Sequence, residues 1–297
     1  MALFFSCALF VAGLAFGSFL NVCISRIPRD LSIVSPRSFC PHCETKIQWR
    51  DNIPLLSWLL LKGHCRTCGV AISRRYPAVE LLTAVLFAGN YASFGLTWVG
   101  LKACVFCFLV VGLIFMDAET GLLPHEFTYT GILLGFAFAW VVAPFDVSGT
   151  VLILRAFGLR ELAPGPGLWL LDAAVAAAFG AGFFYVAWGL YYLVRKREGI
   201  GLGDIALIAM VGAFLGLKLT ILVVFLSPIL ATLFAFSLLF ENPTARQATY
   251  APEASGGDAA NSFLSRAVPF GVFLGSSALV ALLFGDKIWT WYLGMFR

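Results

Sequence analysis

The chain has 297 residues, of which 60% are hydrophobic and only 12% are charged. With a mean hydropathy of +0.91, it has too little polar surface to cover a water-soluble globule, which excludes that class. The net charge of +4 fits orientation in a membrane and requires no nucleic-acid partner. The composition therefore predicts an integral membrane protein surrounded by lipid.

Apolar stretches long enough to cross a hydrocarbon core of about 30 Å recur along most of the chain. Helices are expected because no barrel-like alternation of polar and apolar residues is present. The fold class is thus all-α and polytopic, with about eight transmembrane helices over residues 3–24, 77–95, 98–116, 126–144, 168–194, 205–217, 219–240 and 267–285. The sixth span is short, because only Gly216–Lys218 can break the apolar block 205–240; a re-entrant segment is the alternative there.

The distribution of charge predicts the orientation and the domains. Residues 25–76 carry nine Lys or Arg against three acidic residues, so the positive-inside rule places this segment in the cytoplasm and the N-terminus outside. The first span lacks a basic start and is too long for a signal-peptide core, so we expect it to remain as an anchor. The domains are a first helix (1–24), a cytosolic domain (25–76) and a membrane domain (77–297).

Two other stretches depart from the pattern of long helices. Residues 145–167 fit a short interfacial helix and a turn on the outer side. Residues 241–266 are rich in Ala, Ser, Asn and Gly and lack periodicity, which predicts a mobile cytosolic loop.

Two lone carboxylates stand where long apolar runs meet polar turns on the predicted cytosolic side. Asp117 ends the third span, before a Gly and a Pro that break the helix, and Asp204 begins the sixth, after three alternating glycines. Two acids so placed can share one proton and activate water, as in an aspartic peptidase. Taken singly, each has a plainer interpretation: Asp117 as an interfacial anchor, and Asp204 as a solvated residue at the start of a helix.

Four cysteines in the cytosolic domain form a paired Cys-x-x-Cys pattern. Cys40 and Cys43 are followed after 21 residues by Cys65 and Cys68. Two such turns can present four thiolates tetrahedrally to Zn²⁺, and a reducing cytosol disfavours disulfides. A closed four-thiolate site is structural, so we expect zinc to stabilise this domain. His42 and His64 are alternative ligands, each more typical of a residue outside the metal shell.

Two further acids lie within apolar runs. Asp172, near the outer start of the fifth span, is interpreted as an interfacial anchor. Glu80, just inside the second span, adjoins the cysteine-containing domain and could act together with it.

Several motifs taken together resemble one family over nearly the whole chain. In chain order they are Gly17–Val22 with Arg26 and Pro28, the two Cys-x-x-Cys pairs, Asp51–Trp58, Arg75–Leu81, Asp117–Pro124, Glu198–Asp204 and Val268–Gly271. They resemble the motifs of the type IV prepilin peptidases, which are bifunctional leader peptidases and N-methyltransferases of pilus assembly and type II secretion.

The resemblance implies a membrane aspartic peptidase of the bacterial inner membrane with Asp117 and Asp204 as its catalytic residues. It implies prepilins or pseudopilins as substrates, cleavage after a leader glycine, and methylation of the new N-terminus with S-adenosylmethionine. No residue is assigned to that cofactor; Glu80 is a candidate for the methyltransferase site by position only. The chain departs from the family at His125, where an acid is frequent, and at Ala206, where a lysine is frequent, so pH optimum and substrate preference are the properties most affected.

Three alternatives remain open at this stage. An intramembrane aspartyl protease of presenilin type also uses an aspartate and a Gly-x-Gly-Asp motif, but it would not explain the cysteines. A non-enzymatic membrane module with a zinc-stabilised cytosolic face is the second. The third is a family member without methyl transfer, against which the complete cytosolic domain argues.

Overall fold

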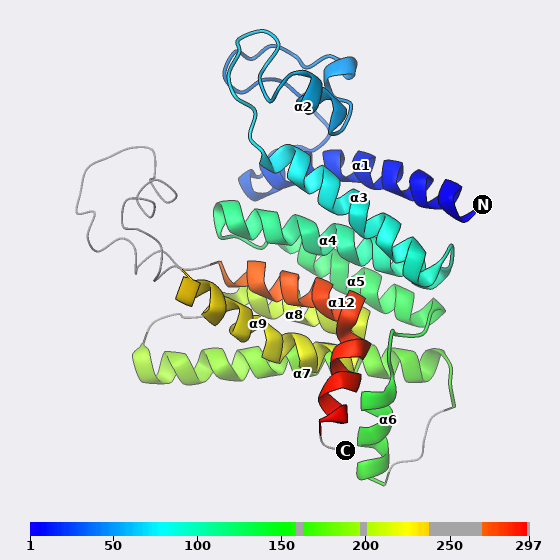
Figure 1. Cartoon of the computed structure of the whole chain (residues 1–297). Helices are drawn as coiled ribbons and strands as arrows, with labels where there is room; N and C mark the ends of the chain where they lie inside the picture. Colours follow the sequence, from blue (N-terminus) through cyan, green and yellow to red (C-terminus); the bar gives the residue numbers. More distant parts are fainter. Residues whose placement is uncertain (159–162, 197–200, 238–268, 296–297) are drawn as a thin grey trace.

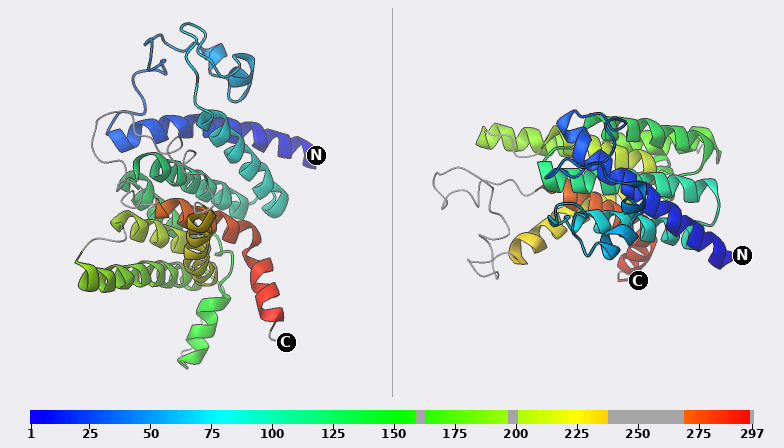
Figure 2. Two further views of the ribbon diagram at one scale, coloured as in Figure 1. Left: turned by 60° about the vertical axis from the view of Figure 1, so that its left-hand side comes forward. Right: turned by 90° about the horizontal axis from the view of Figure 1, so that it is seen from above.

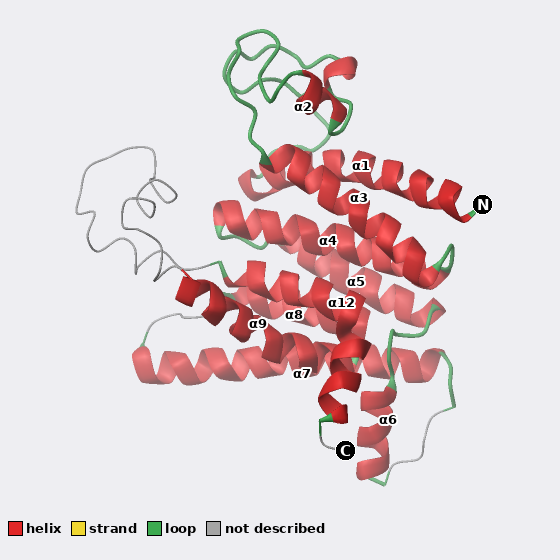
Figure 3. Cartoon of the chain, viewed as in Figure 1, coloured by secondary structure: helices red, strands yellow, loops and turns green. Residues whose placement is uncertain are grey.

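The computed structural model describes residues 1–158, 163–196, 201–237 and 269–295 (Figure 1). Within these ranges the regular elements are helices, and extended pairing is limited to two isolated bridges, Phe39 with Lys46 and His64 with Ala71 (Figure 3). The long helices are α1 (Ala2–Arg26), α3 (Arg75–Phe94), α4 (Trp98–Thr120), α5 (His125–Val141), α7 (Pro166–Arg195), α8 (Leu202–Leu215), α9 (Leu217–Ser237) and α12 (Phe270–Gly294). The shorter ones are η1 (Ile27–Arg29), η2 (Trp49–Asp51), α2 (Leu56–Leu60) and α6 (Ser148–Ala156).

A helix occupies each of the eight ranges in which the sequence predicts one, so the all-α class is confirmed. Five of them, α1, α4, α7, α9 and α12, are long and apolar enough to cross a membrane. Of the others, α8 has 14 residues and α5 has 17, against about 20 for a full crossing. The remaining helix, α3, includes the polar residues Arg75, Glu80 and Asn90.

The short helix α6 lies in the stretch where the sequence predicts one, whereas the loop expected at 241–266 falls outside the described residues.

The long helices pack into one bundle, with α1 and α7 on opposite sides of it (Figures 1 and 2). Small residues bring α1 against α3: a Cβ added at Gly13 would lie 2.5 Å from Ala84 Cα, and one at Gly17 would lie 2.7 Å from Glu80 Cα. Such close backbone approach is typical of helices that associate in lipid. On the other side, α8 is enclosed by α5, α7, α9 and α12.

The break between α8 and α9 lies at Gly216, as the sequence predicts, in a left-handed backbone conformation with φ of +83°. A Cβ at Gly216 would come within 2.3 Å of Asp172 Oδ2, so this position requires glycine. Asp172 Oδ1 accepts hydrogen bonds from Thr150 Oγ1 at 2.6 Å and from the Leu217 amide at 3.4 Å. Asp172 is fully buried; it therefore holds the turn between two helices and is not the exposed interfacial anchor that the sequence indicated.

Lys102 on α4 is the charged counterpart of Asp172. Both side chains are 0% exposed, and their charges interact. Lys102 Nζ lies 5.0 Å from the centre of the Phe145 ring. Neither Lys102 Nζ nor Asp172 Oδ2 has a hydrogen-bond partner among the described residues. Lys102 and Asp172 thus place two buried ionisable groups, one on α4 and one on α7, at the end of the bundle where α4 begins.

We expect Lys102→Met to lower the free energy of unfolding by about 3–5 kcal/mol, because it leaves the Asp172 charge buried without compensation. The double variant Lys102→Met/Asp172→Asn should recover much of that loss, since an asparagine can still accept from Thr150. Thermal unfolding in detergent measures both, with Lys287→Met at an exposed position of α12 as the control. A double variant no more stable than Lys102→Met would contradict the pairing.

Candidate active site

Asp117 lies in the last turn of α4, which ends at Gly121 in a left-handed conformation. Its side chain is buried in spite of its position near the helix end, with only 6% of the residue exposed. Asp117 Oδ2 accepts a hydrogen bond of 3.0 Å from the backbone amide of Val272, and a Cβ added at Gly271 would lie only 2.7 Å from the same oxygen. Gly271 and Val272 belong to the first turn of α12, whose N-terminus therefore faces Asp117.

Asp204 lies in the first turn of α8, at the position where a carboxylate can accept from the start of its own helix. Its Oδ2 accepts from the Gly201 amide at 3.3 Å, and only 8% of the residue is exposed. The carboxylate is thus held near the helix end that favours negative charge. Glu198, Gly199 and Ile200 of the preceding motif lie outside the described residues.

The structure brings the two aspartates to the same end of the bundle, where α4 ends and α8 and α12 begin (Figure 1). The charge of Asp117 acts on Asp204. Leu123, in the turn after α4, fills the space beside them: a Cβ at Gly203 would lie 2.8 Å from Leu123 Cβ, and one at Gly271 would lie 3.1 Å from Leu123 Cδ1. Two buried carboxylates that influence each other in this way are suited to sharing a proton.

Sequence reasoning did not identify the Val272 amide, or the close approach of Gly271, as part of this site. They are separated from Asp117 by about 155 positions, and backbone donors have no residue-type signature. The one signal was the Pro269–Phe270–Gly271 motif: Pro269 precedes the first helical residue of α12, and the glycine leaves room for a carboxylate.

The four cysteines expected to bind a metal come together, with their sulfurs all within 4.8 Å of one another. Cys40 Sγ and Cys68 Sγ are 3.8 Å apart, and sulfurs at the corners of a tetrahedral Zn²⁺ site with bonds of about 2.3 Å would be spaced about 3.8 Å apart. Hydrogen bonding with Thr45 lowers the pKa of the Cys43 thiol to about 6, which favours the thiolate form that binds metal. The cluster fits a closed zinc site.

The two Cys-x-x-Cys turns have the same backbone hydrogen bonds. The Cys40 amide donates to Thr45 O at 3.0 Å, and the Cys65 amide donates to Val70 O at 2.8 Å. A reverse bond closes each turn, from Glu44 to Cys40 O at 2.8 Å and from Gly69 to Cys65 O at 2.9 Å. The backbone hydrogen bonds of each turn thus orient its own two cysteine sulfurs. His42 and His64 are not part of the cluster.

An ion pair attaches the second turn to the rest of the domain. Arg66 donates to Asp51 through Nε at 2.9 Å and through Nη2 at 2.6 Å. The guanidinium holds the pKa of the Asp51 carboxyl below its usual range. This two-point contact fixes the cysteine turn against η2.

Glu80 connects the cysteine-containing domain to the helices. The side chain is buried, with 7% of the residue exposed, and Glu80 Oε2 accepts from the Leu55 amide at 2.7 Å. Leu55 has a positive φ of 61°, an uncommon conformation for leucine that this hydrogen bond supports. Glu80 therefore holds the domain against α3.

A second link joins the start of α3 to the helix that carries Asp117. Arg75 forms an ion pair with Glu119, two residues beyond Asp117 on α4. Asn21 Nδ2 on α1 donates to Tyr76 O at 3.0 Å. The point where the chain leaves the cysteine-containing domain is thereby fixed to the end of the bundle that holds the aspartates.

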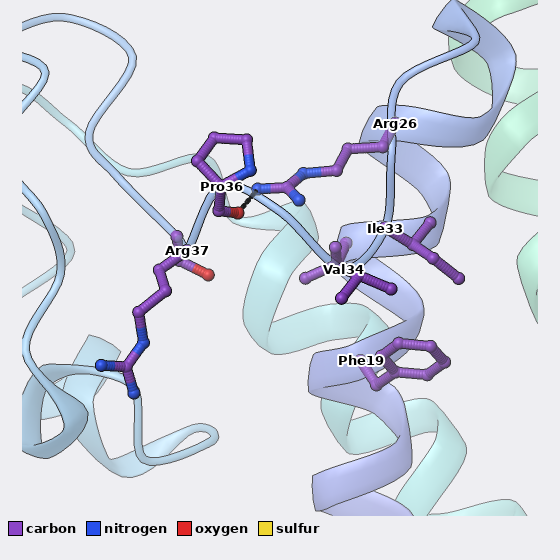
Figure 4. Close-up of a pocket in the computed structure, with 8 residues that line it drawn as sticks. Phe19, Arg26, Ile33, Val34, Pro36 and Arg37 are labelled. Atoms are coloured by element: carbon purple, nitrogen blue, oxygen red, sulfur yellow. Dashed lines mark hydrogen bonds between the residues drawn. The ribbon is translucent and has the colours of Figure 1, made fainter.

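A hollow of about 190 Å³ lies between the end of α1 and the segment that follows it (Figure 4). The walls include Phe19, Ile33 and Val34. Arg26 donates to Pro36 O at 2.7 Å and to Ser32 O at 2.8 Å. Its guanidinium is thus engaged in holding this segment to α1.

Two family models match the chain. Residues 11–94 match the one described as the bacterial peptidase A24 N-terminal domain, and residues 104–236 match the one described as the type IV leader peptidase family. The first covers α1 from residue 11 onward, the cysteine-containing domain and α3, whereas the second contains both aspartates.

Several curated relatives carry the name prepilin leader peptidase/N-methyltransferase. The protein from Aeromonas hydrophila is 32% identical over 99% of this chain and 95% of its own length. The protein from Pseudomonas aeruginosa is 31% identical over 95% of this chain and 91% of its own length. The protein from Myxococcus xanthus is 43% identical over 71% of this chain, and the match spans 56% of that protein. No solved structure matches the chain significantly.

Proposed function

Because the chain belongs to the type IV leader peptidase family, we propose that it is a prepilin leader peptidase that also methylates the N-terminus it exposes. The observation that carries the proposal is the pair of buried, mutually interacting aspartates at one end of the helix bundle. Its substrates are the prepilins or pseudopilins of a pilus or secretion system. S-adenosylmethionine is the methyl donor.

The proposed location is the bacterial inner membrane, with eight crossings and the N-terminus outside. In this topology, the helix end that holds Asp117 and Asp204 faces the cytosol, together with the cysteine-containing domain. An apolar substrate helix docks beside the bundle, so its leader stays in the cytosol and its scissile bond reaches the membrane edge. The orientation is supported by the nine basic residues between positions 25 and 76.

The proposed peptidase mechanism uses one ionised and one protonated aspartate, since two close negative charges in a buried site repel each other. The ionised member takes a proton from water as the water attacks the scissile carbonyl. The protonated member donates to the carbonyl oxygen.

Zinc, bound by Cys40, Cys43, Cys65 and Cys68, has a structural role in this proposal. A metal held by four thiolates leaves no open position for water. The amine to be methylated emerges beside the aspartates, so the methyl-transfer pocket lies where the cysteine-containing domain meets the bundle.

The test is co-expression with a prepilin and mass analysis of the product's N-terminus. We expect loss of the leader and addition of one methyl group, with the uncleaved precursor in cells that lack the enzyme. A precursor that stays intact beside abundant, folded enzyme would overturn the peptidase and favour a non-enzymatic membrane module. Cleavage inside the apolar segment would instead indicate a protease of presenilin type.

The variant Glu80→Gln separates the two activities in this proposal. Glutamine keeps an oxygen that can accept from the Leu55 amide, so the domain should stay attached, but the negative charge is lost. We expect methylation to fall while leader cleavage stays near the wild-type rate. Product mass reports both on one sample. Normal methylation in Glu80→Gln would restrict Glu80 to its contact with Leu55.

A further inference from the structure

We propose that Arg75, at the start of α3, binds the carboxylate of the methyl donor. This inference rests on the methyl transfer in the proposed function, and it names a ligand contact in that site. The contact is one between a guanidinium and the amino-acid carboxylate of S-adenosylmethionine.

The guanidinium of Arg75 is held in place by contacts within the protein. Arg75 is the first residue of α3, where the chain passes from the cysteine-containing domain to the bundle (Figure 1). Its Nη1 donates to Glu119 Oε1 on α4, and its Cζ lies 4.5 Å from the centre of the Tyr76 ring. The Tyr76 carbonyl in turn accepts from Asn21 at 3.0 Å. These contacts orient the guanidinium in advance, which lowers the cost of binding a ligand.

One polar atom of this side chain is buried without a partner. Arg75 Nε makes no hydrogen bond within the part of the chain that the structure describes. The side chain as a whole is 14% exposed, so it lies at the edge of the bundle and not in its core. A charged N–H that is withdrawn from water without an acceptor is unfavourable, and it requires an explanation. A ligand that brings an acceptor to Nε provides one.

The edge of the guanidinium that includes Nε is suited to a carboxylate. Arg66 uses the same edge for Asp51, with Nε at 2.9 Å and Nη2 at 2.6 Å from the carboxylate oxygens. At Arg75 the contact with Glu119 is made through Nη1, on the other side of the group. A second carboxylate can therefore bind at the Nε edge through two parallel hydrogen bonds, which fix its orientation as well as its position.

The start of α3 also favours an anion. Arg74 and Arg75 occupy the N-cap and the first helical position, and the first turn contains no acidic residue. This order reverses the usual preference for negative charge at the N-terminus of a helix. Glu119 brings one negative charge to this point from α4. A carboxylate ligand adds a second beside the two arginines.

The position of Arg75 favours the methyl donor over the other carboxylate formed at this end, the C-terminus of the released leader. Arg75 belongs to the unit matched by the N-terminal family model, whereas Asp117 and Asp204 belong to the unit matched by the leader peptidase model. Glu80 follows on the same helix, about 7.5 Å further along its axis. Arg75 therefore lies where the cysteine-containing domain meets the bundle, which is the proposed place of methyl transfer.

Equilibrium binding of two ligands to the purified full-length protein tests the contact. Decarboxylated S-adenosylmethionine lacks only the carboxylate of S-adenosylmethionine. For Arg75→Met we expect the affinity for S-adenosylmethionine to fall by about 10- to 100-fold, with the affinity for the decarboxylated ligand within about twofold of wild type. The second ligand thus also shows that the variant folds. Arg75→Lys keeps the charge but cannot form two parallel bonds, so its loss should be intermediate.

Glu119→Gln is the control for loss of the ion pair, because it removes the charge that faces Arg75 and leaves the guanidinium in place. It should bind S-adenosylmethionine at least as tightly as wild type, since one competing negative charge is gone. An equal loss of affinity in Glu119→Gln and Arg75→Met would contradict a direct contact. So would an equal loss for both ligands in Arg75→Met.

Two further outcomes separate this inference from the function on which it rests. If Arg75→Met binds S-adenosylmethionine normally but binds a leader peptide with a free C-terminal carboxylate more weakly, Arg75 belongs to the peptidase product and the inference is wrong. If the folded wild-type protein binds neither S-adenosylmethionine nor its decarboxylated form, the proposed methyl transfer itself is wrong.

Discussion

Replacing Asp117 or Asp204 by asparagine should lower the rate of prepilin cleavage by roughly 10²- to 10⁴-fold, the range expected when a group that transfers protons in the transition state is removed. Both residues are buried at one end of the bundle. The substitution keeps the size of the side chain. The loss should therefore appear in kcat, with the amount of folded protein unchanged.

The control is Asp286→Asn on α12, because Asp286 is exposed and contacts only Lys218 at 3.2 Å among the described partners. Cleavage is measured on a co-expressed prepilin at matched membrane abundance, and methylation on a supplied mature peptide. We expect the Asp286 variant to cleave normally and all three variants to methylate. Efficient cleavage by either Asp117→Asn or Asp204→Asn would show that this aspartate is not catalytic and would favour its plainer interpretation as an interfacial residue.

Removing the metal should have the largest effect on stability, confined to residues 27–74. Structural Zn²⁺ bound by thiolates contributes on the order of 10 kcal/mol to the folding of small domains. This segment depends on such support, because several of its large apolar side chains, including Val34, Trp49 and Leu60, are exposed. Chelation, or Cys65→Ser, should make the segment the first site of proteolytic cleavage. Methylation should be lost before leader cleavage.

Metal analysis, limited proteolysis and both activity assays check this expectation on the same preparations. The Cys7→Ser variant is the matched control, because Cys7 lies on α1 outside the cluster. It should retain zinc and normal protease resistance. A purified wild-type protein that contains no zinc would contradict a four-cysteine metal site. So would a Cys65→Ser variant that still binds the metal tightly.

The main features of the fold could be predicted because they depend on local patterns. Apolar runs marked the eight helices, and Gly216 marked the break between α8 and α9. The Cys-x-x-Cys spacing predicted a cluster that the structure contains. Asp117 and Asp204 stand at the polar ends of apolar runs, so their common end of the bundle followed from counting the crossings between them.

Contacts between segments that are distant in the sequence could not be predicted from such local patterns. The hydrogen bond from the Leu55 amide to Glu80 and that from the Val272 amide to Asp117 depend on how the helices pack. Asp172 was misinterpreted for the same reason. A carboxylate near the start of an apolar run has the same sequence pattern whether it faces the membrane surface or, as here, a buried lysine and a turn between helices.

The short helix α8 has a consequence for how the enzyme is made. At 14 residues, it is about 21 Å long, too short to settle in a bilayer as an independent span. It becomes stable only when α5, α7, α9 and α12 surround it, and α9 and α12 both follow α8 in the chain. The helix that positions Asp204 is therefore held in place only after α9 and α12 have been made, so both aspartates are synthesised before the packing that brings them together.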